Sequence, residues 1–188
     1  MSNEANIREF AINTSVESDL YGLHSMVWSC FDPDEKERPF LFRFEKIGDM
    51  GFVHVRSTVK PARVPETMLA EPSFSLREGQ RLRFDIRAVP VKRTTDDKRR
   101  ETPLRGKAIL DWFMEKAKTR GFDPIYETLR FQNRPTRFQK GESMLTVNDT
   151  VISGQLIVTD PQTFCREALA KGIGRYKAFG FGMLRCWE

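Results

Sequence analysis

Two runs of alternating apolar and polar residues, joined by a short glycine-containing segment, constrain the fold of this chain more than any other feature. Residues 40–46 read Phe-Leu-Phe-Arg-Phe-Glu-Lys, and residues 52–58 read Phe-Val-His-Val-Arg-Ser-Thr. A period of two is that of a strand with one buried face, and Gly48 and Gly51 between the runs favour a reversal of the chain. The sequence therefore predicts a β-hairpin whose phenylalanines, at every second residue of 40–44, face the core.

The segments around this hairpin predict a strand, a helix, a short helical turn and another strand. They cover residues 7–13, 15–31, 65–70 and 81–89, respectively. The helix is predicted because Leu20, Leu23 and Val27 recur at helical spacing after a candidate N-cap at Thr14 or Ser15. Strand, helix, hairpin, helical turn and strand make the βαββαβ order of a ferredoxin-like unit.

The second half of the chain looks like a modified copy of the first. It predicts a loop over residues 92–107, a helix over 108–120, strands over 125–131 and 144–159 around a basic loop at 134–141, a helix over 161–170 and a last strand over 181–187. A chain of 188 residues is long enough for two small domains. We therefore expect an α+β protein of two tandem ferredoxin-like, RRM-like domains, residues 1–90 and 91–188.

Charge is distributed unevenly between the two halves. Residues 1–80 hold 9 Lys and Arg against 13 Asp and Glu, whereas residues 81–188 hold 22 against 13. A basic half in a folded protein suggests a polyanionic partner, most often a nucleic acid. A solvated basic surface without such a partner is the alternative.

Several classes of site and location are disfavoured by composition. The three cysteines, Cys30, Cys165 and Cys186, are far apart and odd in number, which fits neither a disulfide framework nor a paired-cysteine zinc site. The only histidines are His24 and His54, so chemistry that needs a histidine cluster is excluded. We expect no metal and no small-molecule cofactor. Because no apolar run reaches about 20 residues and the N-terminus is polar, we expect a cytoplasmic protein without a membrane partner.

The most specific local signal is the glycine-rich segment of residues 172–182. It holds the glycines Gly172, Gly174, Gly180 and Gly182 and the cations Arg175 and Lys177. Glycine lets a backbone approach a ligand closely, and the two cations suit a phosphate chain. The segment is not a dinucleotide fingerprint, because Lys177 stands where the third glycine would be, nor is it a Walker loop. A flexible turn into an edge strand is the alternative.

Tyr21 and His24 lie three residues apart on the predicted helix, so both side chains lie on one helix face. An imidazole in this position can move a proton at neutral pH, and a phenol can orient a phosphodiester. A purely structural histidine is the common alternative, and it is our interpretation of His54.

Two basic stretches are candidate RNA-binding segments. The first holds Lys92, Arg93, Lys98, Arg99, Arg100, Arg105 and Lys107, and the second holds Arg130, Arg134, Arg137 and Lys140 with Phe131 and Phe138 interleaved. Arginine binds phosphate oxygens in a bidentate manner and stacks on bases.

Four stretches, spread over nearly the whole chain, resemble the CasE family of CRISPR-RNA-processing endoribonucleases, which belongs to the RAMP superfamily. They are residues 19–28, 39–46, 83–92 and 154–160, the last leading into residues 172–184. The combination of the glycine-rich segment with the Tyr21 and His24 pair is the specific part of this resemblance.

The resemblance implies tandem ferredoxin-like domains that bind the stem-loop of a CRISPR repeat and cut at the 3′ base of the stem without metal. It places the catalytic histidine on His24, its tyrosine partner on Tyr21 and the lysine of the glycine-rich loop on Lys177. It also implies that the cleaved RNA stays bound and that the chain joins the other subunits of the Cascade complex, its backbone subunit included.

The residues present can supply this chemistry. A ribose 2′-hydroxyl can attack its own adjacent phosphate, so the protein needs only positioning, proton transfer and charge stabilisation. His24 would be the base for the 2′-hydroxyl or the acid for the leaving 5′-oxygen, and Lys177 would offset charge on the phosphorane. Two alternatives stay open: an RNA stem-loop-binding subunit that does not cut, and a structural protein of an assembly.

Overall fold

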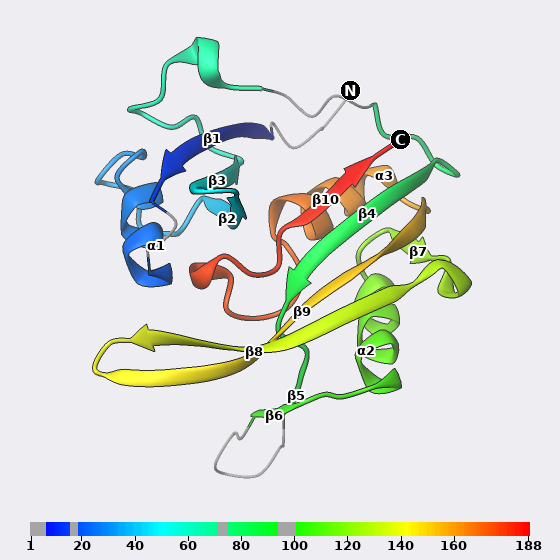
Figure 1. Ribbon diagram of the computed structural model, residues 1–188. Coiled ribbons are helices and arrows are strands. Elements are labelled where there is room, and N and C mark those ends of the chain that lie inside the picture. Colours follow the sequence, from blue (N-terminus) through cyan, green and yellow to red (C-terminus); the bar gives the residue numbers. More distant parts are fainter. Residues whose placement is uncertain (1–6, 16–18, 71–74, 94–100) are drawn as a thin grey trace.

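The computed structural model describes residues 7–15, 19–70, 75–93 and 101–188, which form two larger antiparallel sheets with helices packed on them and a separate two-stranded ribbon (Figure 1). The first sheet has the neighbour order β1-β3-β2 and is made of β1 (Arg8–Thr14), β2 (Phe40–Ile47) and β3 (Met50–Ser57). The predicted hairpin is confirmed, because β2 and β3 pair around Gly48, whose φ is +59°. Phe40 and Phe42 are buried as predicted and Phe44 is half-buried, but Leu41 and Arg43 on the opposite face are buried as well, so β2 is covered on both faces over its first four residues.

Helix α1 (Leu20–Trp28) packs on this sheet and is shorter than the expected residues 15–31. Its cap is Asp19, whose Oδ1 accepts hydrogen bonds from the backbone N–H groups of Tyr21 and Gly22, each at 2.8 Å. A carboxylate in this position satisfies N–H groups that the helix leaves open, so the helix begins at Leu20 and not after Thr14.

The second sheet has the neighbour order β10-β4-β9-β7, and β8 also pairs with β9. Its strands are β4 (Arg81–Ala88), β7 (Phe122–Pro124), β8 (Arg130–Lys140), β9 (Ser143–Val158) and β10 (Leu184–Trp187). The accompanying helical segments are η1 (Glu66–Met68), α2 (Lys107–Ala117), η2 (Tyr126–Thr128), α3 (Pro161–Thr163), η3 (Phe164–Ala170) and η4 (Lys177–Phe179). The order β4, α2, β8, β9, η3 and β10 follows the βαββαβ plan, so the fold class is α+β with ferredoxin-like units in tandem.

The expectation that residues 81–89 close the first unit is wrong. Strand β4 pairs with β9 and β10 of the second sheet, and its Phe84 ring stacks on Phe113 of α2 with centroids 5.2 Å apart. On the side of β1 away from β3, the described residues form an isolated β-bridge between Glu9 and Ala70. Sheet membership therefore favours a division of the chain before Arg81, and the domain ranges 1–90 and 91–188 stay a prediction.

The two predicted basic loops also differ from the structure. Residues 134–140 belong to β8, which forms a long hairpin with β9, and β5 (Val91–Arg93) pairs with β6 (Glu101–Pro103) within the expected loop of residues 92–107. Most side chains of β8 are exposed and only Phe138 is buried. A strand that buries so little lacks the apolar alternation by which strands are predicted.

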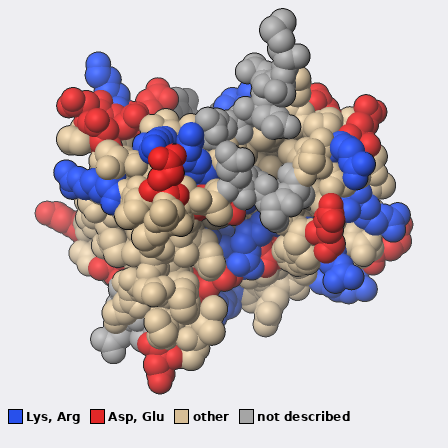
Figure 2. Space-filling model, turned by 90° about the horizontal axis from the view of Figure 1, so that it is seen from above, with Lys and Arg blue, Asp and Glu red and all other residues tan. Residues whose placement is uncertain are grey.

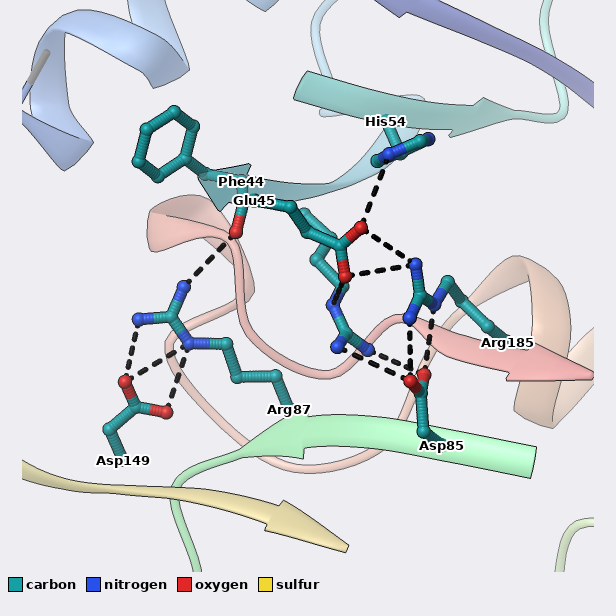
Figure 3. A network of polar contacts seen from close by, with 8 residues as sticks. Phe44, Glu45, His54, Asp85, Arg87, Asp149 and Arg185 are labelled. Atoms are coloured by element: carbon teal, nitrogen blue, oxygen red, sulfur yellow. Dashed lines mark hydrogen bonds and ion pairs between the residues drawn. The ribbon is translucent and has the colours of Figure 1, made fainter. Parts of the chain in front are cut away.

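A network of ion pairs joins the two sheets at Asp85 of β4 (Figure 3). Arg43 of β2 donates to Asp85 (Nη1 to Oδ1, 2.6 Å), and so does Arg185 of β10 (Nη2 to Oδ2, 2.5 Å). Arg185 also pairs with Glu45 at 2.9 Å, and Glu45 lies 3.4 Å from Nε2 of His54. His54 thus contacts this network through Glu45, and its purely structural role stays a prediction.

A second cross-connection starts at Arg56 of β3, which is only 5% exposed. Its Nε donates to Glu9 at 2.6 Å, and its Nη1 donates to the backbone carbonyls of Leu184 at 2.7 Å and Leu169 at 3.3 Å. These contacts fix the C-terminal segments, which contain the glycine-rich loop, against the first sheet.

Candidate active site

Helix α1 presents Tyr21 and His24 differently. The Tyr21 side chain is 56% exposed, whereas His24 is half-buried against aromatic rings. The His24 ring centroid lies 5.9 Å from that of Trp28, 5.8 Å from Phe40 and 6.4 Å from Phe42. Its Nδ1 is buried and has no hydrogen-bond partner among the described residues, which leaves Nε2 as the ring nitrogen that a substrate can reach.

Burial lowers the pKa of His24 below its ordinary value of 6.5, and the positive charge of Arg38 lowers it further. Both effects disfavour the imidazolium. At neutral pH the ring is therefore uncharged and able to accept a proton.

The glycine-rich loop closes on itself between its two ends. The backbone N–H of Ile173 donates to the carbonyl of Gly182 at 2.8 Å. Gly172 and Gly182 have φ of +70° and +87°, and a Cβ at Gly172 would lie 2.6 Å from the Gly182 carbonyl oxygen. At these two positions glycine is needed for the loop's own closure.

Phe42 of β2 brings helix and loop together, because its ring contacts His24 on one side and Gly180 on the other. A Cβ placed on Gly180 would lie 3.0 Å from that ring. Lys177, in η4 of the same loop, donates from Nζ to the backbone carbonyl of Lys171 at 2.6 Å. The loop therefore lies beside the helix that carries His24.

Lys177 lies in a cationic environment. Burial lowers its pKa most, and the charges of Arg38, Arg120 and Lys171 also lower it, while the charge of Glu167 raises it. Sequence reasoning missed Arg38, Arg120 and Lys171, because they come from three separate segments and belong to no motif. Arg38 stands out, since its charge acts on the pKa of both Lys177 and His24.

The hairpin of β8 and β9 reaches the glycine-rich loop through Phe138. The ring centroid of Phe138 lies 4.7 Å from that of Phe179, 6.3 Å from Phe181 and 6.4 Å from Tyr176. The hydroxyl of Tyr176 in turn donates to Glu101 of β6 at 2.9 Å. Hairpin, loop and β6 thus form one contiguous region beside α1.

Apart from the half-buried Lys177, the predicted basic residues that the structure describes are all exposed, although not all of them lack a partner. The exposed set is Lys92, Arg93, Arg105, Lys107, Arg130, Arg134, Arg137, Lys140 and Arg175. Arg130 donates to the carbonyls of Glu127 and Leu129, and Arg175 pairs with Glu101 at 2.7 Å. Lys98, Arg99 and Arg100 lie outside the described residues.

The surface charges and the cysteines add little to this site. Basic and acidic side chains are interleaved on the face in Figure 2, so the net positive charge does not form one continuous patch there. None of the three cysteines forms a disulfide with a described residue; Cys165 is buried and Cys30 and Cys186 are half-buried. Within the described ranges there is no cluster of three or more His, Cys, Asp or Glu residues suited to a metal ion, and no helix with the length and apolar character of a membrane span.

Comparison with known proteins identifies the family. The family model described as CRISPR associated protein matches residues 4–186. The Cascade subunit CasE of the CRISPR system of Escherichia coli strain K12 is 28% identical over 189 residues, which covers 88% of this chain and 90% of the relative. The CRISPR-associated endoribonuclease Cse3 of Thermus thermophilus is 30% identical over 121 residues, which covers 58% and 57% of the two chains.

Solved structures share the fold over almost the full length. The structure of CRISPR endoribonuclease Cse3 bound to a 19-nucleotide RNA superimposes with a TM-score of 0.80 at 22% identity, covering 97% of this chain and 99% of the other. Since the family match spans nearly every residue, the resemblance inferred from sequence is confirmed, and the chain belongs to the CasE family of CRISPR-associated proteins.

Proposed function

We propose that this chain is an endoribonuclease that binds the stem-loop of a CRISPR repeat RNA, cuts it at the 3′ base of the stem and stays bound to the product as a Cascade subunit. The names of the relatives support RNA processing and assembly with Cascade. The observation that carries the proposal is the environment of His24. It is a half-buried imidazole of lowered pKa, on a helix packed beside a lysine-bearing loop.

In the proposed reaction the ribose 2′-oxygen bonds to its adjacent phosphorus while the bond from phosphorus to the 5′-oxygen breaks. Neutral His24 takes the proton of the 2′-hydroxyl, a role that its lowered pKa favours over that of an acid. Tyr21 orients the phosphate or supplies the proton that the leaving 5′-oxygen takes up, and Lys177 offsets charge on the phosphorane. The products are a 2′,3′-cyclic phosphate and a 5′-hydroxyl, and no step requires a metal ion.

The exposed cations Arg134, Arg137 and Lys140 make the hairpin of β8 and β9 the proposed contact for the RNA stem. The deep, narrow major groove of A-form RNA hides the base edges, so we expect the cations of this hairpin to contact the phosphates along the stem. Phe138 then links stem binding to the glycine-rich loop.

The proposal is tested by incubating the purified chain in EDTA with the stem-loop RNA of the host's own CRISPR repeat. We expect a single cut at the 3′ base of the stem and no cut when the attacking nucleotide lacks its 2′-hydroxyl. A hairpin that is bound but stays whole would identify a stem-loop-binding subunit. A strict requirement for Mg²⁺ would contradict the metal-free reaction.

Replacing Arg134, Arg137 and Lys140 together by Gln is expected to reduce the magnitude of the slope of log affinity against log salt concentration by about 2 to 3. Each phosphate that a cation neutralises contributes roughly 0.9 to this slope. Affinity for the hairpin RNA is measured across a series of salt concentrations. The matched control replaces Arg77, Arg81 and Arg83, which are exposed at and before the start of β4, and should keep the slope. If the two triple variants have equal slopes, the RNA stem does not bind to the hairpin of β8 and β9.

A further inference from the structure

Arg38 is a half-buried arginine that has no acidic partner among the described residues, unlike three other arginines of low exposure. Arg43, Arg56 and Arg87 pair with Asp85, Glu9 and Asp149 at 2.6 Å each. The guanidinium of Arg38 makes no hydrogen bond or ion pair with any residue in the described ranges, and it lies over the face of Phe40, with Cζ 5.9 Å from the ring centroid.

The lack of a partner is costly for this group. Burial lowers the pKa of Arg38, so part of its hydration has been removed. A guanidinium has five N–H donors and no acceptor, and a charge that loses water without gaining a partner destabilises the folded state. An anion that accepts hydrogen bonds from the guanidinium of Arg38 would offset this cost.

The position of Arg38 points to the active site. Phe40 is in contact with both Arg38 and His24, whose ring centroid lies 5.8 Å from that of Phe40. The charge of Arg38 also acts on Lys177, another half-buried cation. Two cations held near one imidazole repel each other, and an anion between them would relieve that repulsion.

The main chain at Arg38 is held in place before any ligand arrives. Arg38 precedes Pro39, which restricts its backbone to extended conformations. The carbonyl of Pro39 accepts hydrogen bonds from the Ser57 hydroxyl at 3.0 Å and from the Thr58 N–H at 3.3 Å. A donor that is already in place stabilises a developing charge at little cost of reorganisation.

We propose that Arg38 is a catalytic residue that binds the non-bridging oxygens of the scissile phosphate and offsets their charge as the phosphorane forms. This inference rests on the proposed function. The planar guanidinium can donate two parallel hydrogen bonds to a phosphate, which a single ammonium cannot do.

The test compares Arg38→Met, which keeps an aliphatic side chain against Phe40, with Arg83→Met, which removes an exposed arginine from β4. Single-turnover cleavage of the repeat hairpin by Arg38→Met should be slower by about 10²- to 10³-fold, as for the loss of one preorganised donor. Affinity for the uncleavable 2′-deoxy hairpin should change only a few-fold, and Arg83→Met should match wild type. Millimolar guanidinium should restore part of the rate of Arg38→Met and should not accelerate His24→Ala.

A pH profile separates this role from a merely structural one. Among the described charged groups, Arg38 is the one whose charge lowers the pKa of His24. Removing it should shift the acidic limb of kcat/KM to higher pH, because this limb reports the free enzyme's base.

A wild-type rate in Arg38→Met overturns the inference alone, whereas a hairpin left whole by the wild-type chain overturns the proposed function and the inference with it. If Arg38→Met fails to fold, cleavage by Arg38→Lys is measured instead. A wild-type cleavage rate for Arg38→Lys would show that the reaction does not need the bidentate guanidinium.

Discussion

His24→Ala is expected to cut the repeat hairpin about 10²- to 10⁴-fold more slowly than the wild-type chain, which is the usual contribution of a positioned general base. The affinity for the hairpin should stay nearly unchanged, since the half-buried imidazole is neutral and adds no charge for a phosphate to bind. Single-turnover cleavage in EDTA and binding of the 2′-deoxy hairpin measure the two quantities separately.

The matched control is His54→Ala, because His54 is the only other histidine of the chain. It lies on β3 beside Glu45 and should cut at the wild-type rate. If His24→Ala and His54→Ala cut equally fast, His24 has no part in the reaction.

Asp85→Ala is expected to lower the free energy of unfolding by about 3 to 5 kcal/mol, because it leaves the guanidinium of Arg43 buried without its closest carboxylate. Arg185 loses the same partner, so Glu45 alone is left to offset the charges of both guanidinium groups, at 3.1 Å from Arg43 and 2.9 Å from Arg185. For a chain of this size the melting temperature should fall by roughly 10 °C. Chemical and thermal unfolding of the two proteins measure the difference.

The control is Glu115→Ala, which breaks the exposed ion pair with Lys118 and should leave the melting temperature nearly unchanged.

The effect of Asp85 should also depend on pH. Burial tends to raise the pKa of Asp85, but hydrogen bonds and charges from Arg185 and Arg43 outweigh it and hold the pKa below the ordinary value. The stabilisation is therefore complete above about pH 4 and is lost as the pH falls through the lower pKa of the folded state. Equal melting temperatures for Asp85→Ala and wild type at pH 7 would contradict this account.

Elements whose signal is local could be predicted from the sequence. The hairpin of β2 and β3 follows from alternation, and α2 follows from Ile109 and Phe113 at helical spacing. The partner of β4 could not be predicted, because an alternating strand looks the same whichever sheet it joins. Strand β4 joins the second sheet, where its Phe84 packs on Phe113 of α2, and this contact is not visible in the sequence of β4. Strand β8 escaped prediction for the opposite reason, since nearly all of its side chains face solvent.

Some residues of the candidate site could likewise be predicted from the sequence, and others could not. Tyr21 and His24 are one helical turn apart, and the glycines cluster within eleven residues, so both could be found by spacing. Arg38 could not, because it follows a run of acidic residues and meets His24 only through the packing on Phe40. Tertiary contacts between separate segments produce no periodic pattern in the sequence, so such residues cannot be found by spacing.

The contacts of Arg56 have a consequence for the order in which the chain folds. Its charge is paired with Glu9 within the first sheet, but two further acceptors, the backbone carbonyls of Leu169 and Leu184, lie 113 and 128 residues further along the chain. Contacts between residues so far apart in sequence require the closure of long loops, which slows their formation. The first sheet can therefore form early with Glu9 as the partner of Arg56, and docking of the C-terminal segments completes the hydrogen bonds of the guanidinium later.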